Sequence, residues 1–176
     1  CHGPYFLRAI VELETEEGIV GVGETYGSRE MIRMLDSFYP HILDRSVLTY
    51  RNFGQGEFGL PDRAYTAIEV ACLDAIGKAT NLRICDLLGG PVRTEVEFAA
   101  YLFFRYAADH PTILDDKRIA DSRGTGNDAL DDWGEVRTPE SMAEMAVKFN
   151  QRWGFRVQKL KAGVFQPEME LEALRL

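Results

Sequence analysis

The first residues of the chain alternate between apolar and polar side chains with a period of two. Within residues 5–24, alternate positions of the first run are all apolar: Leu7, Ala9, Val11 and Leu13. Successive side chains of a strand point to opposite faces, so this pattern predicts a strand with one buried face. Residues 15–18 predict a turn ending in glycine, and the return strand completes a hairpin. Gly21 and Gly23 in that return strand indicate close approach by another backbone or a ligand.

Two later segments carry apolar residues at the spacing of a helix. Ser28 is the expected N-cap of the first, whose apolar stripe is Met31, Met34, Leu35, Phe38 and Ile42. The second covers residues 64–82, and its stripe contains mostly small residues: Ile68, Ala71, Cys72, Ala75 and Ile76. Small residues predict that this helix packs tightly against a neighbour. The glycine-rich residues 50–62 between the two helices predict a loop.

The second half of the chain predicts strand, long insertion, helix, strand and helix. Residues 95–106 and 157–165 predict buried strands, and residues 107–136 form a polar insertion. Thr138 is the expected N-cap of a helix that has Pro139 in its first turn, and Gly154 is expected to end it. Residues 167–176 begin another helix. The order βαβα implies a parallel sheet covered by helices.

These patterns divide the chain near the turn at 87–93, which contains Gly89, Gly90 and Pro91. We expect residues 1–93 to form an α+β domain with an antiparallel hairpin, and residues 94–176 to form the first βα units of a second domain. The chain lacks an initial Met and stops within a predicted helix. We therefore expect it to be part of a longer protein.

The composition and net charge of the chain indicate which classes of partner it can bind. Apolar residues make up 45% of the chain, charged residues 27%, and the formal net charge is −8. An acidic surface repels phosphate backbones and anionic lipids, so neither nucleic acid nor membrane is an expected partner. The three cysteines are widely spaced, which argues against a disulfide framework or a zinc site, and Cys72 is expected in the core. No signal peptide or run of about 18 apolar residues is recognised, so we expect a cytoplasmic protein.

The strand at 157–165 contains an unusual pair of charges. Lys159 and Lys161 are two residues apart, so their ammonium groups share one face of the strand, with Leu160 opposite. Burying a charged amine is costly, and two adjacent ammonium groups depress each other's pKa, so one of them can act as a base. The alternative is an edge strand whose lysines face solvent and prevent aggregation.

Four segments taken in order resemble the enolase superfamily, of the mandelate racemase/muconate lactonizing type, and within it the glucarate dehydratase group. Residues 18–27 and 65–90, with their "GVGE" and "LLGG" sequences, are similar to the family's capping domain. Residues 101–106 ("YLFFRY") and 154–165 ("GFRVQKLKAGVF") are similar to its first two barrel strands. The resemblance implies an α+β capping domain followed by the beginning of a (β/α) TIM-type barrel.

The resemblance also implies an activity and the residues that carry it. Family members remove the proton α to a carboxylate, hold the enediolate on Mg²⁺, and in the dehydratases then eliminate water. Lys161 matches the base, and Lys159 matches the lysine that supports the substrate carboxylate. His2 and Thr66 match substrate-binding residues. The family's metal ligands lie on later barrel strands, so none is assigned to this chain, and Asp115, Asp116, Asp131 and Asp132 are interpreted as solvated residues.

One departure from the family pattern concerns a substrate-binding tyrosine. The glucarate dehydratase group carries it after the first barrel strand, whereas residues 107–118 contain none, and Tyr106 is the nearest candidate. The expected substrate is a small dicarboxylate or acid sugar, and a homo-oligomer is expected. Two alternatives stay open: another dehydratase or a racemase of the superfamily, and a non-catalytic interaction module if the natural chain ends at residue 176.

Overall fold

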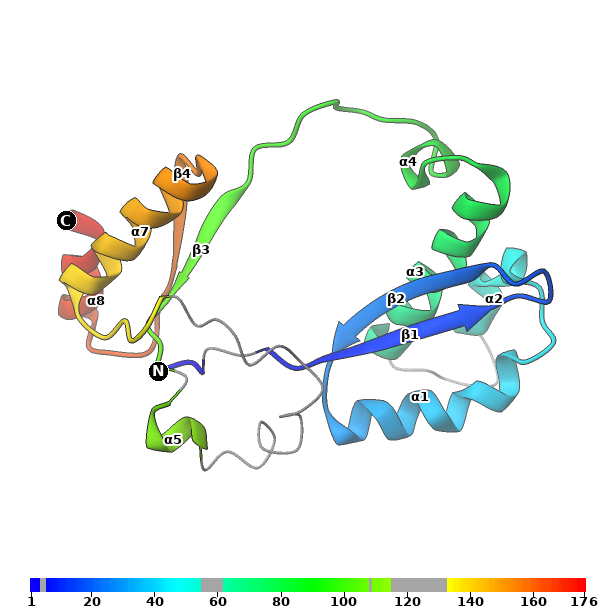
Figure 1. Cartoon of the computed structure of the whole chain (residues 1–176), viewed down its shortest axis with the longest axis horizontal. Helices are drawn as coiled ribbons and strands as arrows, with labels where there is room; N and C mark the ends of the chain where they lie inside the picture. The colour runs from blue at the N-terminus through cyan, green and yellow to red at the C-terminus, as the bar shows by residue number, and fades with distance from the viewer. Residues whose placement is uncertain (4–5, 55–61, 108, 115–132) are drawn as a thin grey trace. The chain divides into compact units, whose positions relative to one another are not determined.

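The computed structural model describes residues 1–3, 6–54, 62–107, 109–114 and 133–176 of the chain (Figure 1). It divides into two compact units. The first unit is Phe6–Thr94, and the second unit combines Cys1–Tyr5 with Glu95–Leu176. The sequence placed the first residues with the hairpin instead. They group with the second unit because the His2 N–H donates to the Phe104 carbonyl and the His2 carbonyl accepts from Tyr106 N–H, both at 2.9 Å.

The first unit contains the predicted hairpin. Strands β1 (Arg8–Glu14) and β2 (Val20–Tyr26) pair antiparallel, from Arg8 opposite Tyr26 to Glu14 opposite Val20. Ala9 is buried, and Gly18 has a φ of 78° in the turn, as the period-two pattern and the turn residues predict. The confirmed pattern gives the hairpin one face for packing and one for solvent.

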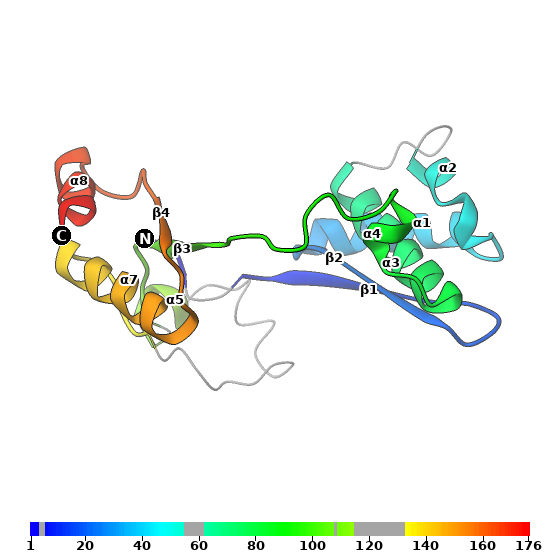
Figure 2. The same cartoon turned by 90° about the horizontal axis from the view of Figure 1, so that it is seen from above.

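The predicted close approach at the two strand glycines is confirmed, and the approaching backbone is that of helix α3 (Asp62–Thr80). A Cβ placed on Gly21 would collide with the Ala71 carbonyl oxygen, and one on Gly23 with the Ala67 carbonyl oxygen. The small residues of α3 and the two glycines of β2 lie at the same interface. Because both lack bulky side chains, the strand and the helix can approach until their backbones touch. Figure 2 shows the hairpin lying along this helix.

The rest of the first unit closes a small apolar core on α3. Helix α1 (Arg29–Ile42) starts at its predicted cap, where the Ser28 hydroxyl accepts the Met31 N–H at 3.0 Å. The core contains four buried residues: Phe38, Phe53, Ile68 and Cys72. Three short elements complete the unit: η1 (Val47–Thr49), α2 (Arg51–Gly54) and α4 (Ile84–Leu87).

The prediction of a loop over residues 50–62 is wrong at both ends. Residues 51–54 form helix α2, and α3 already begins at Asp62. The helical turn forms because Phe53 is only 4% exposed and packs into the core beside Phe38, which fixes the surrounding backbone. Residues 55–61 lie outside the described part of the chain.

The second unit contains the predicted parallel strand pair. Strands β3 (Ala99–Phe103) and β4 (Val157–Lys161) run parallel, from Ala99 opposite Val157 to Phe103 opposite Lys161. Helix α7 (Pro139–Trp153) connects them as the crossover, α8 (Pro167–Arg175) follows β4, and α5 (Pro111–Leu114) follows β3. Both α7 and α8 lie on the same side of the sheet in Figure 1.

The limits of α7 follow from its end residues. The Thr138 hydroxyl accepts the Ser141 N–H at 3.2 Å, and the Ser141 hydroxyl accepts the Thr138 N–H at 3.0 Å, which forms a capping box. Gly154 ends the helix with a φ of 73°. Six buried residues form the core between the helices and the sheet: Ala100, Leu102, Phe104, Val136, Met142 and Met145. The predicted helix and its caps are confirmed.

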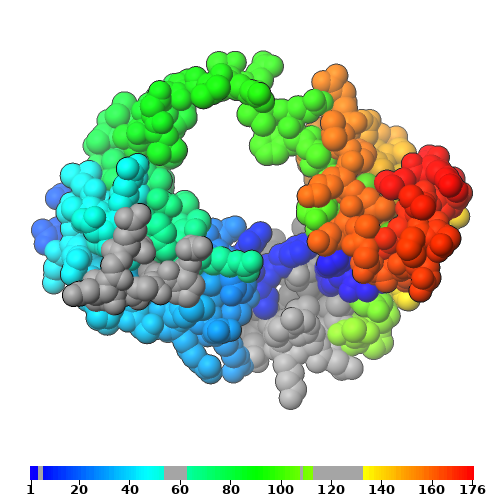
Figure 3. Space-filling model, turned by 180° about the vertical axis from the view of Figure 1, so that it is seen from behind, coloured from blue at the N-terminus to red at the C-terminus, as the bar shows by residue number. Residues whose placement is uncertain are grey.

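The two predicted buried strands each have one exposed face in this structure, which is the alternative left open for the lysines of β4. β3 and β4 are shorter than the predicted segments, and only the face carrying Leu102 and Leu160 packs on the core. On the opposite face Tyr101 is 39% exposed, and Lys159 and Lys161 are exposed (Figure 3, orange atoms for β4). The difference arises because α7 and α8 cover one face, and none of the described elements of the second unit covers the other.

Most of the polar insertion at 107–136 lies outside the described residues. Its two ends are joined, since Arg105 and Val136 exchange backbone hydrogen bonds of 2.8 and 3.0 Å. The four aspartates considered in the sequence, Asp115, Asp116, Asp131 and Asp132, also lie outside the described ranges. Among the helices that the structure describes, none is both long and apolar enough to cross a membrane.

Candidate active site

The two lysines share the exposed face of the parallel sheet, as strand parity predicts. Lys159 lies opposite Tyr101 in the register, and Lys161 lies opposite Phe103. The Lys159 ammonium nitrogen is 4.2 Å from the centroid of the Tyr101 ring, the geometry of a cation–π contact. We call the face formed by Tyr101, Phe103, Lys159 and Lys161 the lysine face. It brings two amines and two aromatic rings onto one surface of the second unit.

His2 extends the lysine face from the N-terminal end of the chain. Its ring lies edge-on to the Phe103 ring, with centroids 5.0 Å apart. The Phe103 ring in turn lies 4.4 Å from the Tyr101 ring. His2 therefore stands at the carboxyl end of the strand pair, where Lys161 is the last residue of β4.

The electrostatics of His2 reflect this position. Partial burial lowers its pKa from the ordinary value of 6.5, and the charges of the N-terminal amine and of Lys161 lower it further. The imidazole is consequently neutral at pH 7, with one nitrogen able to donate a hydrogen bond and the other able to accept one. A neutral imidazole beside an amine suits the binding of substrate hydroxyl or carboxylate groups.

Thr66 is placed differently from the other predicted site residues. It is exposed on α3, one turn after the start of that helix, and it belongs to the first unit. His2, Lys159 and Lys161 belong to the second unit. The structure thus groups three of the four predicted residues on one surface, and the role of Thr66 stays a prediction.

Tyr101 is a candidate site residue that the sequence did not predict. The family resemblance implies a tyrosine after the first barrel strand, but the ring beside Lys159 comes from the strand itself. Tyr106 instead stacks on His110 at 4.1 Å, and the Arg137 guanidinium lies 5.2 Å from the Tyr106 ring centroid. The alternation of Tyr101, Leu102 and Phe103 was a usable signal, yet the register that brings Tyr101 to Lys159 is a tertiary property.

The residues of the lysine face do not form a metal site. Throughout the ranges that the structure describes, no group of three or more His, Cys, Asp or Glu side chains could hold a metal ion. Ammonium groups repel cations, so the lysine face favours an anion instead. The arrangement can bind a carboxylate and move a proton.

Comparisons with known proteins give the chain a family context. Residues 7–89 match the family "Mandelate racemase / muconate lactonizing enzyme, N-terminal domain". Over 99% of its length the chain is 38% identical to a probable glucarate dehydratase of Streptomyces coelicolor, of which it covers 43%. It is also 28% identical, over 94% of its length, to an N-succinyl-L-Arg/Lys racemase of Bacillus cereus, of which it covers 40%.

Solved structures of the enolase superfamily are also similar to this chain. An enolase from Mycobacterium smegmatis complexed with tartrate matches 99% of the chain with a TM-score of 0.77 and 34% identity. An enolase from Pseudomonas fluorescens with bound magnesium, potassium and tartrate matches 96% of the chain with a TM-score of 0.73 and 28% identity. The chain spans 41% and 42% of these two proteins. The shared fold therefore covers both units and less than half of each neighbour.

Proposed function

The chain belongs to the mandelate racemase and muconate lactonizing type of the enolase superfamily, and we propose that it is part of an acid-sugar dehydratase. The observation that carries the proposal is the lysine pair on one exposed face at the carboxyl end of two parallel strands. In βα barrels, side chains at the carboxyl ends of strands form the active site. Similarity to a glucarate dehydratase favours this reaction over others of the superfamily.

In the proposed reaction Lys161 is the base. A lone pair on its ε-nitrogen takes the proton α to a substrate carboxylate, and the electron pair of that C–H bond moves toward the carboxylate to give an enediolate. The carboxylate C=O bond then re-forms, a new double bond forms between the α- and β-carbons, and the bond from the β-carbon to its hydroxyl breaks as that hydroxyl takes a proton and leaves as water. The product is an enol that becomes a 2-keto-3-deoxy acid.

Lys159 has a role separate from that of the base. Its ammonium group, held over the Tyr101 ring, is placed to neutralise the carboxylate on which charge develops. His2 is proposed to bind the substrate from the edge of the lysine face, and Thr66 to contribute from α3 of the first unit. The Tyr101 hydroxyl is a further candidate for a substrate contact, since its ring already lies beside Lys159.

The substrate and the metal ion of the whole protein are proposed from the molecules bound to its relatives. The tartrate and magnesium bound by the P. fluorescens enolase support a small hydroxy-diacid substrate and Mg²⁺ for the whole protein. The family resemblance puts the metal ligands on later barrel strands. We further propose a cytoplasmic homo-oligomer that binds neither nucleic acid nor membrane, in keeping with the net charge of −8.

The test is Lys161→Ala in the full-length protein with Mg²⁺ and glucarate as the first substrate. We expect loss of α-proton exchange with deuterated solvent by about a thousandfold or more, because alanine leaves no amine at the position of the proposed base. Lys148→Ala is the matched control, since Lys148 is an exposed lysine on α7 and should leave exchange unchanged. Exchange at the wild-type rate in Lys161→Ala would show that the assignment of the base is wrong.

A racemase is the second candidate, and the similarity to the N-succinyl-L-Arg/Lys racemase favours it. The product separates the two activities. A dehydratase generates a carbonyl that reacts with a hydrazine or semicarbazide, whereas a racemase changes only the optical rotation. Exchange without carbonyl formation on a panel of acid sugars would select the racemase.

A further inference from the structure

The loop that follows Lys161 is held by a single carboxylate. Glu170, on the first turns of α8, accepts hydrogen bonds from the backbone N–H groups of Gly163, Val164 and Phe165. The nitrogen–oxygen distances lie between 2.7 and 3.0 Å, and Gly163 shares its N–H between both carboxylate oxygens. Glu170 is only 7% exposed. Three consecutive N–H groups thus converge on one buried anion, a backbone anion nest filled from within the chain.

This loop begins where the strand ladder stops. Lys159 is held inside the ladder by its pairing with Tyr101, but Lys161 is the last paired residue of β4. Gly163, two residues later, has a φ of 92°, and from that point the chain turns away from the sheet. The position of Lys161 therefore depends on two anchors: the pairing with Phe103 on one side and the loop on the other.

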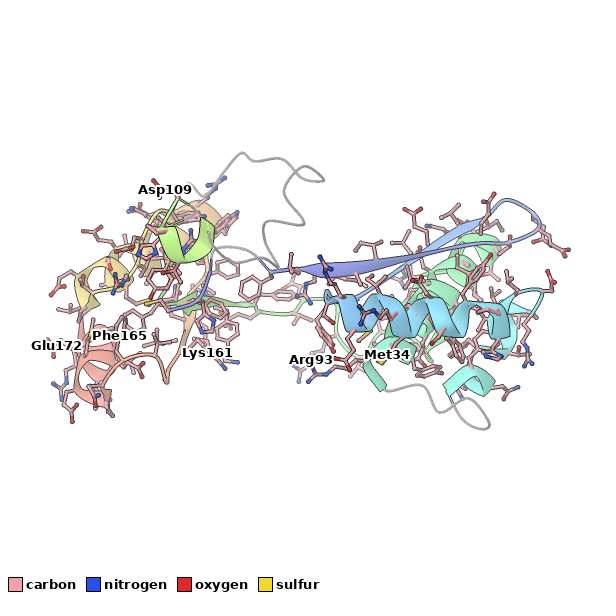
Figure 4. The ribbon with its side chains drawn as sticks, turned by 90° about the horizontal axis from the view of Figure 1, so that it is seen from below. Met34, Arg93, Asp109, Lys161, Phe165 and Glu172 are labelled. Atoms are coloured by element: carbon pink, nitrogen blue, oxygen red, sulfur yellow. The ribbon has the colours of Figure 1, made fainter. Side chains whose placement is uncertain are left out.

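The loop has its own anchor in the core. The Phe165 ring lies edge-on to the buried Phe104 ring at 5.0 Å, and both residues belong to the second unit. Figure 4 labels Lys161 at the end of β4 and Phe165 in the loop toward α8. The ring fixes the far end of the loop, so the carboxylate of Glu170 sets the backbone path between Phe165 and Lys161.

A favourable interaction of Glu170 with the dipole of α8 does not by itself explain its hydrogen bonds to the loop. Glu168 also lies in the first turn of α8, where any carboxylate is favourable, but it is exposed. Glu170 is the acidic residue of this turn that reaches back to the loop. Its pKa is lowered from the ordinary value of 4.5 by the N–H groups of Phe165, Gly163 and Val164, so the carboxylate is charged at neutral pH and accepts every one of these bonds.

We propose that Glu170 is a positioning residue that fixes Lys161 by holding the backbone of residues 163–165. The consequence for the reaction rests on the proposed role of Lys161 as the base, whereas the consequence for the position of Lys161 does not. Proton transfer is sensitive to the placement of the base by less than an ångström, so loosening this loop affects the chemical step more than substrate binding. Lys159, inside the ladder, keeps its place.

The experiment compares Glu170→Gln with Glu168→Gln and Glu170→Asp in the full-length protein. A glutamine offers only one acceptor oxygen and turns its amide hydrogens toward backbone donors, so it cannot replace the carboxylate. We expect amide hydrogen exchange at residues 163–165 to rise by about tenfold or more in Glu170→Gln. The ¹³Cε signal of Lys161 should shift or broaden while that of Lys159 changes little. Glu168→Gln should change neither.

Kinetics provide the second readout. For Glu170→Gln we expect kcat to fall by about tenfold to a hundredfold while KM stays within about twofold, at a temperature where both proteins are folded. Glu170→Asp keeps the charge on a side chain shorter by one methylene, and should recover part of the amide protection and part of kcat. A general loss of folded protein would instead lower kcat in proportion to the loss of near-UV circular dichroism, without rescue by aspartate.

The outcomes separate this proposal from the proposed function. Unchanged amide exchange and an unchanged Lys161 signal in Glu170→Gln would overturn the positioning role, whatever the activity. Faster exchange with kcat unchanged would also overturn it, provided that Lys161→Ala is inactive. If Lys161→Ala keeps its activity, the assignment of the base fails on that result alone, and the NMR comparison still decides whether Glu170 fixes Lys161.

Discussion

Both units of this chain are built on a two-stranded sheet packed against helices, yet the two sheets are constructed in opposite ways. In the first unit, β2 brings glycines to its helix, and the backbone of α3 comes into direct contact with the strand. In the second unit, large side chains such as Leu102 separate the sheet from α7 and α8. The second sheet keeps amines and aromatic rings on its outer face. The first sheet therefore packs backbone against backbone, whereas the second packs through side chains and carries charged and aromatic groups on its exposed face.

The two units also differ in what protects the backbone groups of their edge strands. In the first unit, α3 side chains bind backbone groups of β2: Asp74 accepts the Val22 N–H at 2.8 Å, and Lys78 donates to the Val20 carbonyl at 2.7 Å. Asp74 and Lys78 also pair with each other at 2.7 Å. These contacts satisfy groups that an edge strand would otherwise offer to another chain. In the second unit, the side chains of Lys159 and Lys161 keep β4 polar instead.

The largest expected effect is on the glycine contact of the first unit. In Gly23→Ala the new methyl group meets the Ala67 carbonyl oxygen, and neither backbone can retreat without separating hairpin and helix. We expect a loss of about 4 kcal/mol or more in the free energy of unfolding, measured by urea denaturation. Gly18→Ala is the control, because its Cβ meets no atom within 4 Å and costs only the positive φ, about 1 kcal/mol. Equal effects of the two variants would refute the close-packing account.

The next comparison sets the two faces of the second sheet against each other. Leu102 is 4% exposed and packs into the core, so Leu102→Ala should cost about 3 kcal/mol of stability. Lys161→Ala, on the lysine face, should change stability by no more than about 0.5 kcal/mol, although we expect it to remove activity. Thermal unfolding of the two variants measures the contrast. A strongly destabilised Lys161→Ala would mean that the lysine face contributes to folding as well as to chemistry.

The smallest effect concerns the edge of β2 and its dependence on pH. The hydrogen bond from Lys78, followed by that from the Val22 N–H, lowers the pKa of Asp74 below its ordinary value of 3.8. Since the folded protein binds this proton less readily than the unfolded chain, the carboxylate stabilises the fold above the unfolded pKa. That stability is lost as the pH falls below about 3.8 and through the lowered pKa of the folded state.

Asp74→Asn tests this assignment. At pH 7 we expect a loss of about 1 kcal/mol or less, because the pair is partly exposed. The variant should also lose part of the acid dependence of unfolding below pH 4, measured by urea denaturation at a series of pH values. An acid limb identical to that of the wild type would show that Asp74 does not contribute to it.

Much of the fold could be predicted from local patterns. The hairpin, the caps of α1 and α7 at Ser28 and Thr138, and the parallel order of β3 and β4 all follow from periodicity and end residues. The helical turn at residues 51–54 could not, because it depends on the burial of Phe53 by residues distant in sequence. For the same reason the sequence left open whether the lysines of β4 are buried or face solvent, because a pattern of apolar residues does not say which neighbours cover a strand.

The sequence by itself determined which side chains share a face, since strand parity puts Lys159 and Lys161 together whatever surrounds them. It also indicated a close approach at Gly21 and Gly23, by another backbone or a ligand, and the structure shows that the backbone of α3 fills this space. Only the tertiary structure decided that Tyr101 lies under Lys159, that His2 reaches the lysine face, and that Glu170 holds the loop after Lys161. Strand alternation and the absence of a glycine side chain are local properties, which depend on a few neighbouring residues. Strand register and loop contacts instead arise only when segments far apart in the chain are brought together.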